Sequence, residues 1–313
     1  MISARTVIDK YGIYIFLGLL FVSSSIISPA FLTVQNIKNI LTPTTALGIV
    51  AVGQTFVILI GRGSLDLSVA SVMATVGVVA AKMAQGKDSL LLPAAMTCLL
   101  IGLLVGLVNG LLVTKRKVQP FIASLATMII LQGARFIYTG AAPKGTFPPL
   151  LRFLGTGSIG PIPASILSLA LFVAVAYVVL SKTVYGRRIY ATGANINAAI
   201  LSGYNTDLII IGVYLISGFT AAIAGLYLAA WIGVADSFVG QGYELDSIAA
   251  VVMGGTTFEG GRGGVLGTIA GVLIIMTLYN MVLLLHLPIQ TQFIVKGTVI
   301  ILASSFYIFR RSH

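Results

Sequence analysis

The sequence predicts an all-α fold, a polytopic bundle of about ten transmembrane helices. Of its 313 residues, 58% are hydrophobic and 9% are charged, and the mean hydropathy is +1.04. A soluble domain carries about 25% charged residues, so an ordinary soluble fold is excluded. Because one span needs about 20 apolar residues, the chain supplies roughly ten spans. The apolar runs are continuous and do not alternate with period two, which indicates helices rather than a β-barrel.

The apolar runs place the helices in order along the chain. We interpret the first run as a retained span and not as a signal peptide, because no small-residue cleavage site followed by a soluble domain is present. The eighth run, Leu245–Phe258, has only 14 residues, so it is a short, re-entrant or broken helix. If it does not cross the membrane, the count is nine. The predicted spans are Tyr11–Ala30, Thr45–Gly61, Asp66–Met83, Leu90–Val113, Pro120–Tyr138, Ile162–Leu180, Asp207–Ile232, Leu245–Phe258, Val265–Leu285 and Ile289–Phe309.

The basic residues predict the orientation. With the N-terminus inside, about twelve lysines and arginines fall on the cytoplasmic side and about five outside, as the positive-inside rule requires. Ten spans also put the basic C-terminal end, with Arg310 and Arg311, in the cytoplasm. The net charge of +11 is then explained by the membrane, so no nucleic-acid partner is expected. We expect one transmembrane domain over residues 1–313, with a cytoplasmic loop at about 182–206.

Small residues recur at every fourth position in several spans. Such stripes lie on one helix face and allow two backbones to approach closely in lipid. We therefore expect them to be helix-packing surfaces. The stripes are Gly102, Gly106 and Gly110; Gly263, Gly267 and Gly271; and Ser217, Ala221, Gly225 and Ala229.

The chemistry of an enzyme is missing from the sequence. No P-loop is present, since Gly86-Lys87-Asp88 lacks the hydroxyl and the upstream glycine. The histidines are His286 and His313, and the one cysteine is Cys98, so neither a metal site nor a bound cofactor is expected. We expect every carboxylate to sit at or beyond a span end, which disfavours a proton- or sodium-driven carrier and an ion channel. Energy for uphill transport would then come from another subunit.

The turn between the second and third spans is the first of three candidate elements. The helix stops at glycine and restarts with Asp66, which is expected to cap free N–H groups at the helix start. Arg62 stands four residues earlier and is expected to pair with Asp66. A capped cytoplasmic hairpin is the structural alternative.

The long cytoplasmic loop is the second element. Asn195 is a predicted helix N-cap and Gly203 a predicted stop. Between them, Ile196, Ala199 and Ile200 share one face of a short helix. A partly apolar helix presented to the cytoplasm predicts a docking site for a soluble partner, while a helix lying on the membrane surface is the alternative.

The third element is the stretch around the eighth span. Two carboxylates precede this short helix, and a glycine-rich turn follows it: Glu244, Asp246, Gly254 and Gly255. Amides also interrupt apolar spans, and each must face a neighbour or a wet cavity, because an unpaired amide in hydrocarbon costs several kcal/mol. They either join helices or line a route for a hydroxylated solute; they are Gln54, Asn109 and Asn280. Lys296 lies inside the last span and either snorkels outward or faces the interior.

Taken together, these stretches resemble the permease subunits of bacterial ATP-binding-cassette importers for monosaccharides, the ribose, xylose, arabinose and galactoside group. The resemblance extends from about residue 40 to the C-terminal end. One departure is the longer turn Gly61–Asp66, where the family usually reads Gly-Gly-Ile-Asp-Leu-Ser. The matching segments are Gly53-Gln54-Thr55, Asp66-Leu67-Ser68-Val69-Ala70-Ser71, Asn109-Gly110, Pro120-Phe121-Ile122, Gly186-Arg187, Gly193 to Gly203, Tyr243 to Thr256, Gly260 to Gly263, and Val295-Lys296-Gly297.

The resemblance implies an assembly in the bacterial inner membrane. A second permease chain, identical or paralogous, completes the pathway for a small sugar. A cytoplasmic ATPase with two nucleotide-binding domains holds ATP and Mg, and a periplasmic binding protein delivers the substrate. The coupling helix of such importers matches the 193–203 segment, so the implied coupling residues are Gly193, Asn195, Ala198, Ala199 and Gly203. A permease for an amino acid or a signalling molecule, and an energy-independent channel or secondary carrier, are the alternatives.

Overall fold

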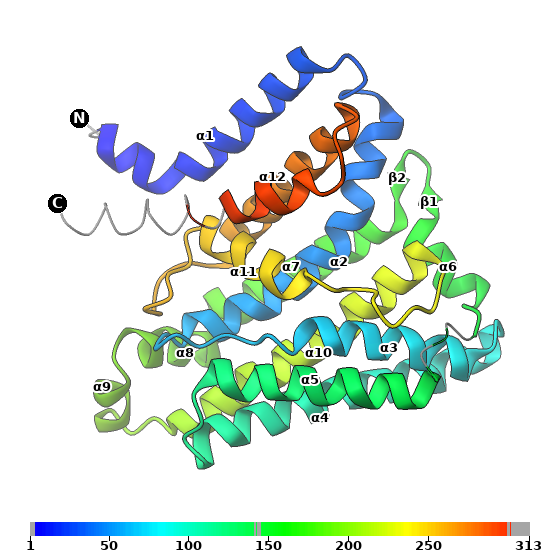
Figure 1. Cartoon of the computed structure of the whole chain (residues 1–313). Helices are drawn as coiled ribbons and strands as arrows, with labels where there is room; N and C mark the ends of the chain where they lie inside the picture. The colour runs from blue at the N-terminus through cyan, green and yellow to red at the C-terminus, as the bar shows by residue number, and fades with distance from the viewer. Residues whose placement is uncertain (1–3, 141, 143–144, 299–300, 302–313) are drawn as a thin grey trace.

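Helices form nearly all of the computed structural model, which describes residues 4–140, 142, 145–298 and 301 (Figure 1). A further helical stretch covers residues 291–298. Two-residue strands β1 and β2 form an antiparallel hairpin in which Ser158 lies opposite Pro163. The elements are α1 (Ala4–Ile27), α2 (Val34–Leu59), α3 (Val69–Ala84), the 3₁₀ helix η1 (Asp88–Leu90), α4 (Leu91–Lys115), α5 (Pro120–Thr139), α6 (Pro149–Thr156), β1 (Ser158–Ile159), β2 (Ile162–Pro163), α7 (Ala164–Lys182), α8 (Val184–Ala194), α9 (Ile196–Leu201), α10 (Thr206–Ile232), α11 (Tyr243–Met253) and α12 (Val265–Leu284).

The predicted all-α membrane bundle is confirmed. In the described part of the chain, six helical segments are long and apolar enough to cross a membrane: α2, η1 with α4, α5, α7, α10 and α12. The apolar stretches Tyr11–Ile27 and Val69–Ala84 are shorter. Of the predicted tenth span, only residues 289–298 and 301 belong to the described residues.

Several boundaries differ from the predicted ones. The second helix begins at Val34 rather than at Thr45, because the Thr33 side chain caps it by accepting from the Asn36 N–H at 3.3 Å. The predicted span missed this first part because its polar residues broke the apolar run. Helix α11, which corresponds to the eighth predicted span, ends at Met253, five residues before the predicted end at Phe258. The third helix begins at Val69, after a turn that leads in from Asp66.

The long helix α10 forms the centre of the bundle and packs against α2, α3 and α4 (Figure 1). Close backbone approach makes this packing possible. A Cβ atom added at Gly106 of α4 would collide with the Tyr214 carbonyl of α10, and one added at Gly225 of α10 would lie 2.6 Å from the Met73 Cα of α3. These two small-residue stripes are therefore packing surfaces, as predicted.

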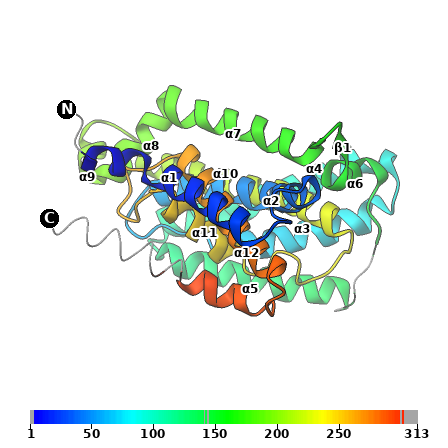
Figure 2. The same cartoon turned by 90° about the horizontal axis from the view of Figure 1, so that it is seen from above.

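The two ends of the bundle are built differently. The start of α1 lies at the same end as α8 and α9 in both views, whereas α6 and the β1–β2 hairpin lie at the opposite end (Figures 1 and 2). The turns after α2 and before α12 also reach the α8–α9 end. The Gly261 N–H donates to the Leu59 carbonyl, and Gly193 of α8 lies against both of these groups.

Candidate functional site

The predicted short helix of the long loop is present as α9. The Asn195 side chain caps it by accepting from the N–H groups of Asn197 and Ala198, at 3.0 and 3.1 Å. The turn after it is closed by Gly203, whose φ of +81° suits glycine and few other residues. Both predicted boundary residues therefore shape this helix.

The exposed apolar residues of α9 are at its end. Leu201 is 89% exposed and Ile200 is 53% exposed, while Ala199 is only 3% exposed. Ala199 thus packs against the chain itself. A partner protein that binds α9 would contact Ile200 and Leu201, with Ala198 exposed beside them.

Four glycines, which we call the glycine junction, join α8 to the rest of the bundle: Gly61, Gly193, Gly260 and Gly261. The Gly261 N–H donates to the Leu59 carbonyl at 2.9 Å, and a Cβ atom at Gly193 would collide with that same carbonyl. The junction therefore holds α8, the end of α2 and the α11–α12 turn in direct backbone contact.

A half-buried tyrosine adds a second link beside the glycine junction. The Tyr190 hydroxyl of α8 donates to the Gly263 carbonyl at 2.9 Å. Burial raises the pKa of Tyr190, so the hydroxyl keeps the proton that it donates. This bond connects α8 to the turn before α12.

The turn after α2 separates Arg62 from Asp66. Gly61, Arg62 and Gly63 all have positive φ, of 76°, 56° and 69°, and this tight turn leaves Arg62 exposed while Asp66 enters the bundle with 1% exposure. The predicted Arg62–Asp66 ion pair is wrong, because the carboxylate is bound by other groups. Asp66 does accept from the Ser68 N–H at 3.0 Å, but Ser68 is the N-cap residue of α3 and no side chain caps the first turn of this helix, so Asp66 shapes the turn before α3 rather than capping the helix.

Asp66 is the centre of a polar network that connects α4, α5 and α10 with the turn before α3. Its carboxylate accepts from the Ser217 hydroxyl of α10 at 2.7 Å and from the Ser68 hydroxyl at 2.5 Å. The Asn109 amide of α4 donates to the Ser68 hydroxyl at 2.9 Å, and its oxygen accepts from the Thr127 hydroxyl of α5 at 2.7 Å. We call these five residues the Asp66 network.

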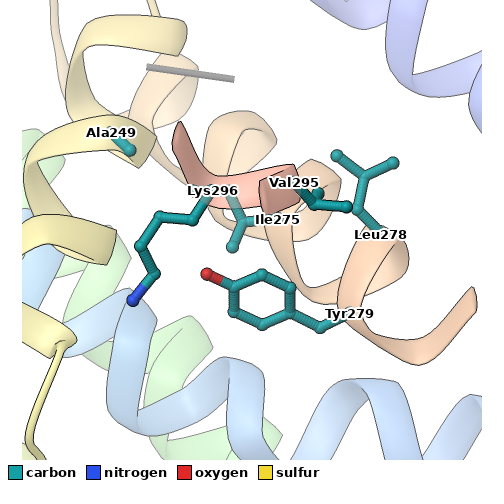
Figure 3. Close-up of a pocket in the computed structure, with 6 residues that line it drawn as sticks. All are labelled: Ala249, Ile275, Leu278, Tyr279, Val295 and Lys296. Atoms are coloured by element: carbon teal, nitrogen blue, oxygen red, sulfur yellow. The ribbon is translucent and has the colours of Figure 1, made fainter. Parts of the chain in front are cut away.

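Asp246 is the second carboxylate inside the bundle. It is 5% exposed, lies 2.8 Å from the Lys296 ammonium, and accepts from the Tyr279 hydroxyl at 2.7 Å. Figure 3 shows Lys296 and Tyr279 beside a cavity of about 10 Å³, with their polar ends toward the same side. Both carboxylates lie near helix starts as expected, Asp66 in the turn before α3 and Asp246 in the first turn of α11. Both are nevertheless buried, so the inference that the bundle holds no carboxylate is wrong.

The three predicted amides occupy different surroundings. Asn109 belongs to the Asp66 network, and Asn280 exchanges two hydrogen bonds with Asn36 of α2, at 3.0 and 2.8 Å. Gln54 is fully buried, and neither its amide nitrogen nor its oxygen has a hydrogen-bond partner. Two amides therefore join helices, and Gln54 alone of the three is left without a bond.

The remaining predicted residues shape α11. The Glu244 carboxylate accepts from the Gly242 N–H at 2.9 Å at the start of the helix. A Cβ atom at Gly254 would lie 2.5 Å from the Gly267 carbonyl carbon of α12, so this glycine permits close packing. The following Gly255, with φ of +86°, turns the chain away from α11.

Arg135 was missed at the sequence level. It lies within α5 and is only 5% exposed. The available signal was a single arginine inside an apolar span, a position where charge is costly and marks a functional site by default.

The comparisons with known proteins identify the family. Residues 36–304 match the family described as "Branched-chain amino acid transport system / permease component". The chain belongs to this family. The permease is 43% identical over 294 residues to the ribose import permease protein RbsC of Haemophilus influenzae, covering 93% of this chain and 90% of that one.

Two further relatives are similar over nearly their whole length. The permease is 40% identical to RbsC of Bacillus subtilis, covering 95% of this chain and 92% of the other. It is 34% identical to the galactose/methyl galactoside import permease protein MglC of Escherichia coli, covering 96% and 94%. No solved structure matches it significantly. The permease is thus a multi-pass membrane protein, as its apolar helices also indicate.

Proposed function

We propose that this chain is the membrane-spanning permease subunit of an ATP-driven monosaccharide importer in the bacterial inner membrane. The observation that carries this proposal is its similarity, over nine tenths of its length, to permeases named for the import of ribose and galactose. The chain itself carries no P-loop, so ATP and Mg belong to a partner subunit.

The proposed topology has ten spans with both ends in the cytoplasm, and residues 1–313 act as one transmembrane domain. Its support is the gathering of basic residues at the α8–α9 end, where Lys115 pairs with Asp207 at 2.8 Å and Arg187 and Arg188 lie on α8. Basic residues are enriched on the cytoplasmic side. In this proposal the 182–206 loop lies in the cytoplasm.

The proposed assembly contains three kinds of partner. A second permease chain, identical or paralogous, completes the pathway, and a periplasmic binding protein delivers the sugar. A cytoplasmic ATPase with two nucleotide-binding domains docks on α9 as the coupling helix. In this proposal Asn195 and Gly203 shape the helix, Ala198 lies on its exposed side, Ala199 anchors it, and Gly193 joins it to the bundle.

The arrangement of the helices suggests how docking changes the permease. A displacement of α9 moves α8, and the glycine junction passes that displacement to the turn after α2. This turn leads directly to Asp66, whose network connects α4, α5 and α10 with the turn before α3. ATP-driven closure can only shift the permease if its contacts differ between the two access states. The exposed end of α9 offers such contacts, and the unpaired amide of Gln54 is our proposed pathway group.

Replacing Leu201 with arginine tests the docking role. Leu201 is 89% exposed, so the substitution leaves the fold intact and removes an apolar contact. We expect ATP-dependent sugar uptake to fall at least about tenfold, with loss of ATPase co-purification. Leu287→Arg, in the turn after α12, is the control and should retain both. Normal uptake and co-purification by Leu201→Arg would contradict the proposal.

Amino-acid import is the second candidate, because the family description names branched-chain amino acids. The two functions differ in an uptake screen with the complete importer. Uptake of D-ribose, D-galactose or L-arabinose supports the sugar importer, whereas uptake of leucine without any of these sugars supports the second candidate. Uptake that persists without the ATPase would instead indicate a channel or a secondary carrier.

A further inference from the structure

A polar cavity of about 90 Å³ lies between α3, α5 and the segment that leads into α11. We call it the Arg135 cavity. It shares no residue with the Asp66 network or with the Lys296–Asp246 pair. Its polar lining residues are Ser71, Gln132, Arg135, Ser237, Gln241 and Glu244.

Arg135 brings unused hydrogen-bond donors to this cavity. Its Nη1 atom makes two long bonds, to the Ser71 carbonyl at 3.3 Å and to the Thr75 hydroxyl at 3.4 Å. Its Nε atom has no partner, and no carboxylate lies within ion-pair distance of it in the described part of the chain. Of the five N–H donors of a guanidinium, the two on Nη2 make no hydrogen bond to the described residues, so they remain available to a bound molecule. A buried, weakly bonded arginine inside a span indicates a functional cavity rather than a structural contact.

The other lining residues supply hydrogen-bond acceptors and side chains that can both donate and accept a hydrogen bond. The Glu244 carboxylate uses one oxygen for the Gly242 N–H and contributes an acceptor beside the cavity. The Gln132 and Gln241 side chains make no hydrogen bond to the described residues, and each offers both a donor and an acceptor. An anion would face Glu244 and a cation would face Arg135, so the cavity suits an uncharged solute that both donates and accepts.

The size of the cavity fits part of such a solute. One water needs about 10–15 Å³, so the cavity accommodates several groups of that size, such as the hydroxyls along one edge of a small sugar. We propose that the Arg135 cavity is a contact site for the hydroxyl groups of a monosaccharide during its passage through the permease. This inference rests on the proposed function and names a substrate site within it.

Gln132→Ala is the deciding variant, because it removes a polar cavity group that bonds to nothing else. The complete importer in proteoliposomes, with ATP and saturating loaded binding protein, reports the maximal uptake rate of D-ribose and of 2-deoxy-D-ribose. We expect the D-ribose rate to fall roughly 2- to 10-fold, as for one lost hydrogen bond, and the ratio of the two rates to change. A purely structural defect would lower both rates and leave their ratio unchanged.

Two further variants complete the experiment. Gln35→Ala, an exposed glutamine on α2, is the matched control and should transport as wild type. Arg135→Gln should lower the D-ribose rate more strongly than Gln132→Ala; if it fails to fold, Gln132→Ala alone decides. Wild-type rates and ratio in Gln132→Ala would overturn this inference and indicate a cavity that holds only water. A wild-type importer that moves no monosaccharide with ATP would overturn the proposed function as well.

Discussion

Replacing Asp66 with alanine should destabilise the bundle strongly. The carboxylate accepts two short bonds, from the Ser217 hydroxyl at 2.7 Å and from the Ser68 hydroxyl at 2.5 Å. A hydrogen bond to a charged group contributes about 1.5–3 kcal/mol, so the loss is about 3–6 kcal/mol. With roughly 2–4 °C per kcal/mol in domains of 150–250 residues, and less in larger ones, Tm should fall by about 5–15 °C.

The single cysteine provides the assay. Cys98 is fully buried in α4, so a thiol-reactive fluorophore labels it only as the bundle opens on heating. Asp66→Asn keeps one acceptor oxygen and should fall between wild type and Asp66→Ala. The control is Asp207→Ala, whose ion pair with Lys115 is exposed and contributes about 0–1 kcal/mol. A Tm for Asp66→Ala within about 2 °C of wild type would refute a stabilising role of the network.

Two further predictions use the same labelling assay. Lys296→Met leaves Asp246 buried without its cation and should lower the free energy of unfolding by about 3–5 kcal/mol. The double variant that also carries Asp246→Asn should recover part of this loss. Equal stability of the wild type, the single variant and the double variant would contradict a buried ion pair. Gly193→Ala should lower Tm and ATP-driven uptake because the added methyl group collides with the Leu59 carbonyl, while Gly18→Ala, with no atom within 4 Å, should change neither. Wild-type behaviour of Gly193→Ala would show that the backbone contact there can relax.

Features that depend on neighbouring residues were predictable from the sequence. Apolar runs identified the helical segments, and the Asn195 cap and Gly203 stop bounded α9 because capping acts within a few residues. The small-residue stripe at Gly102, Gly106 and Gly110 predicted a packing face, and α10 packs there. These signals are local, so one sequence contains them.

The candidate sites were less predictable because their partners are far apart in the chain. Asp66 lies 151 positions before Ser217, and nothing in either segment indicates that they meet. Asp246 pairs with Lys296 in the same way. Sequence position alone put both carboxylates at helix ends, whereas their burial results from tertiary packing. The Arg135 cavity likewise needs residues from three separate elements.

The glycine junction has a consequence for how directly a displacement of the 182–206 loop would reach the membrane helices. Side chains between moving elements can change rotamer and absorb a small shift, but Gly61, Gly193, Gly260 and Gly261 have none. In the proposed mechanism, a displacement of the 182–206 loop would therefore be transmitted to the turn after α2 through direct backbone contacts. One added methyl group at this junction would separate these backbones, and in the proposed mechanism it would favour one of the two access states over the other.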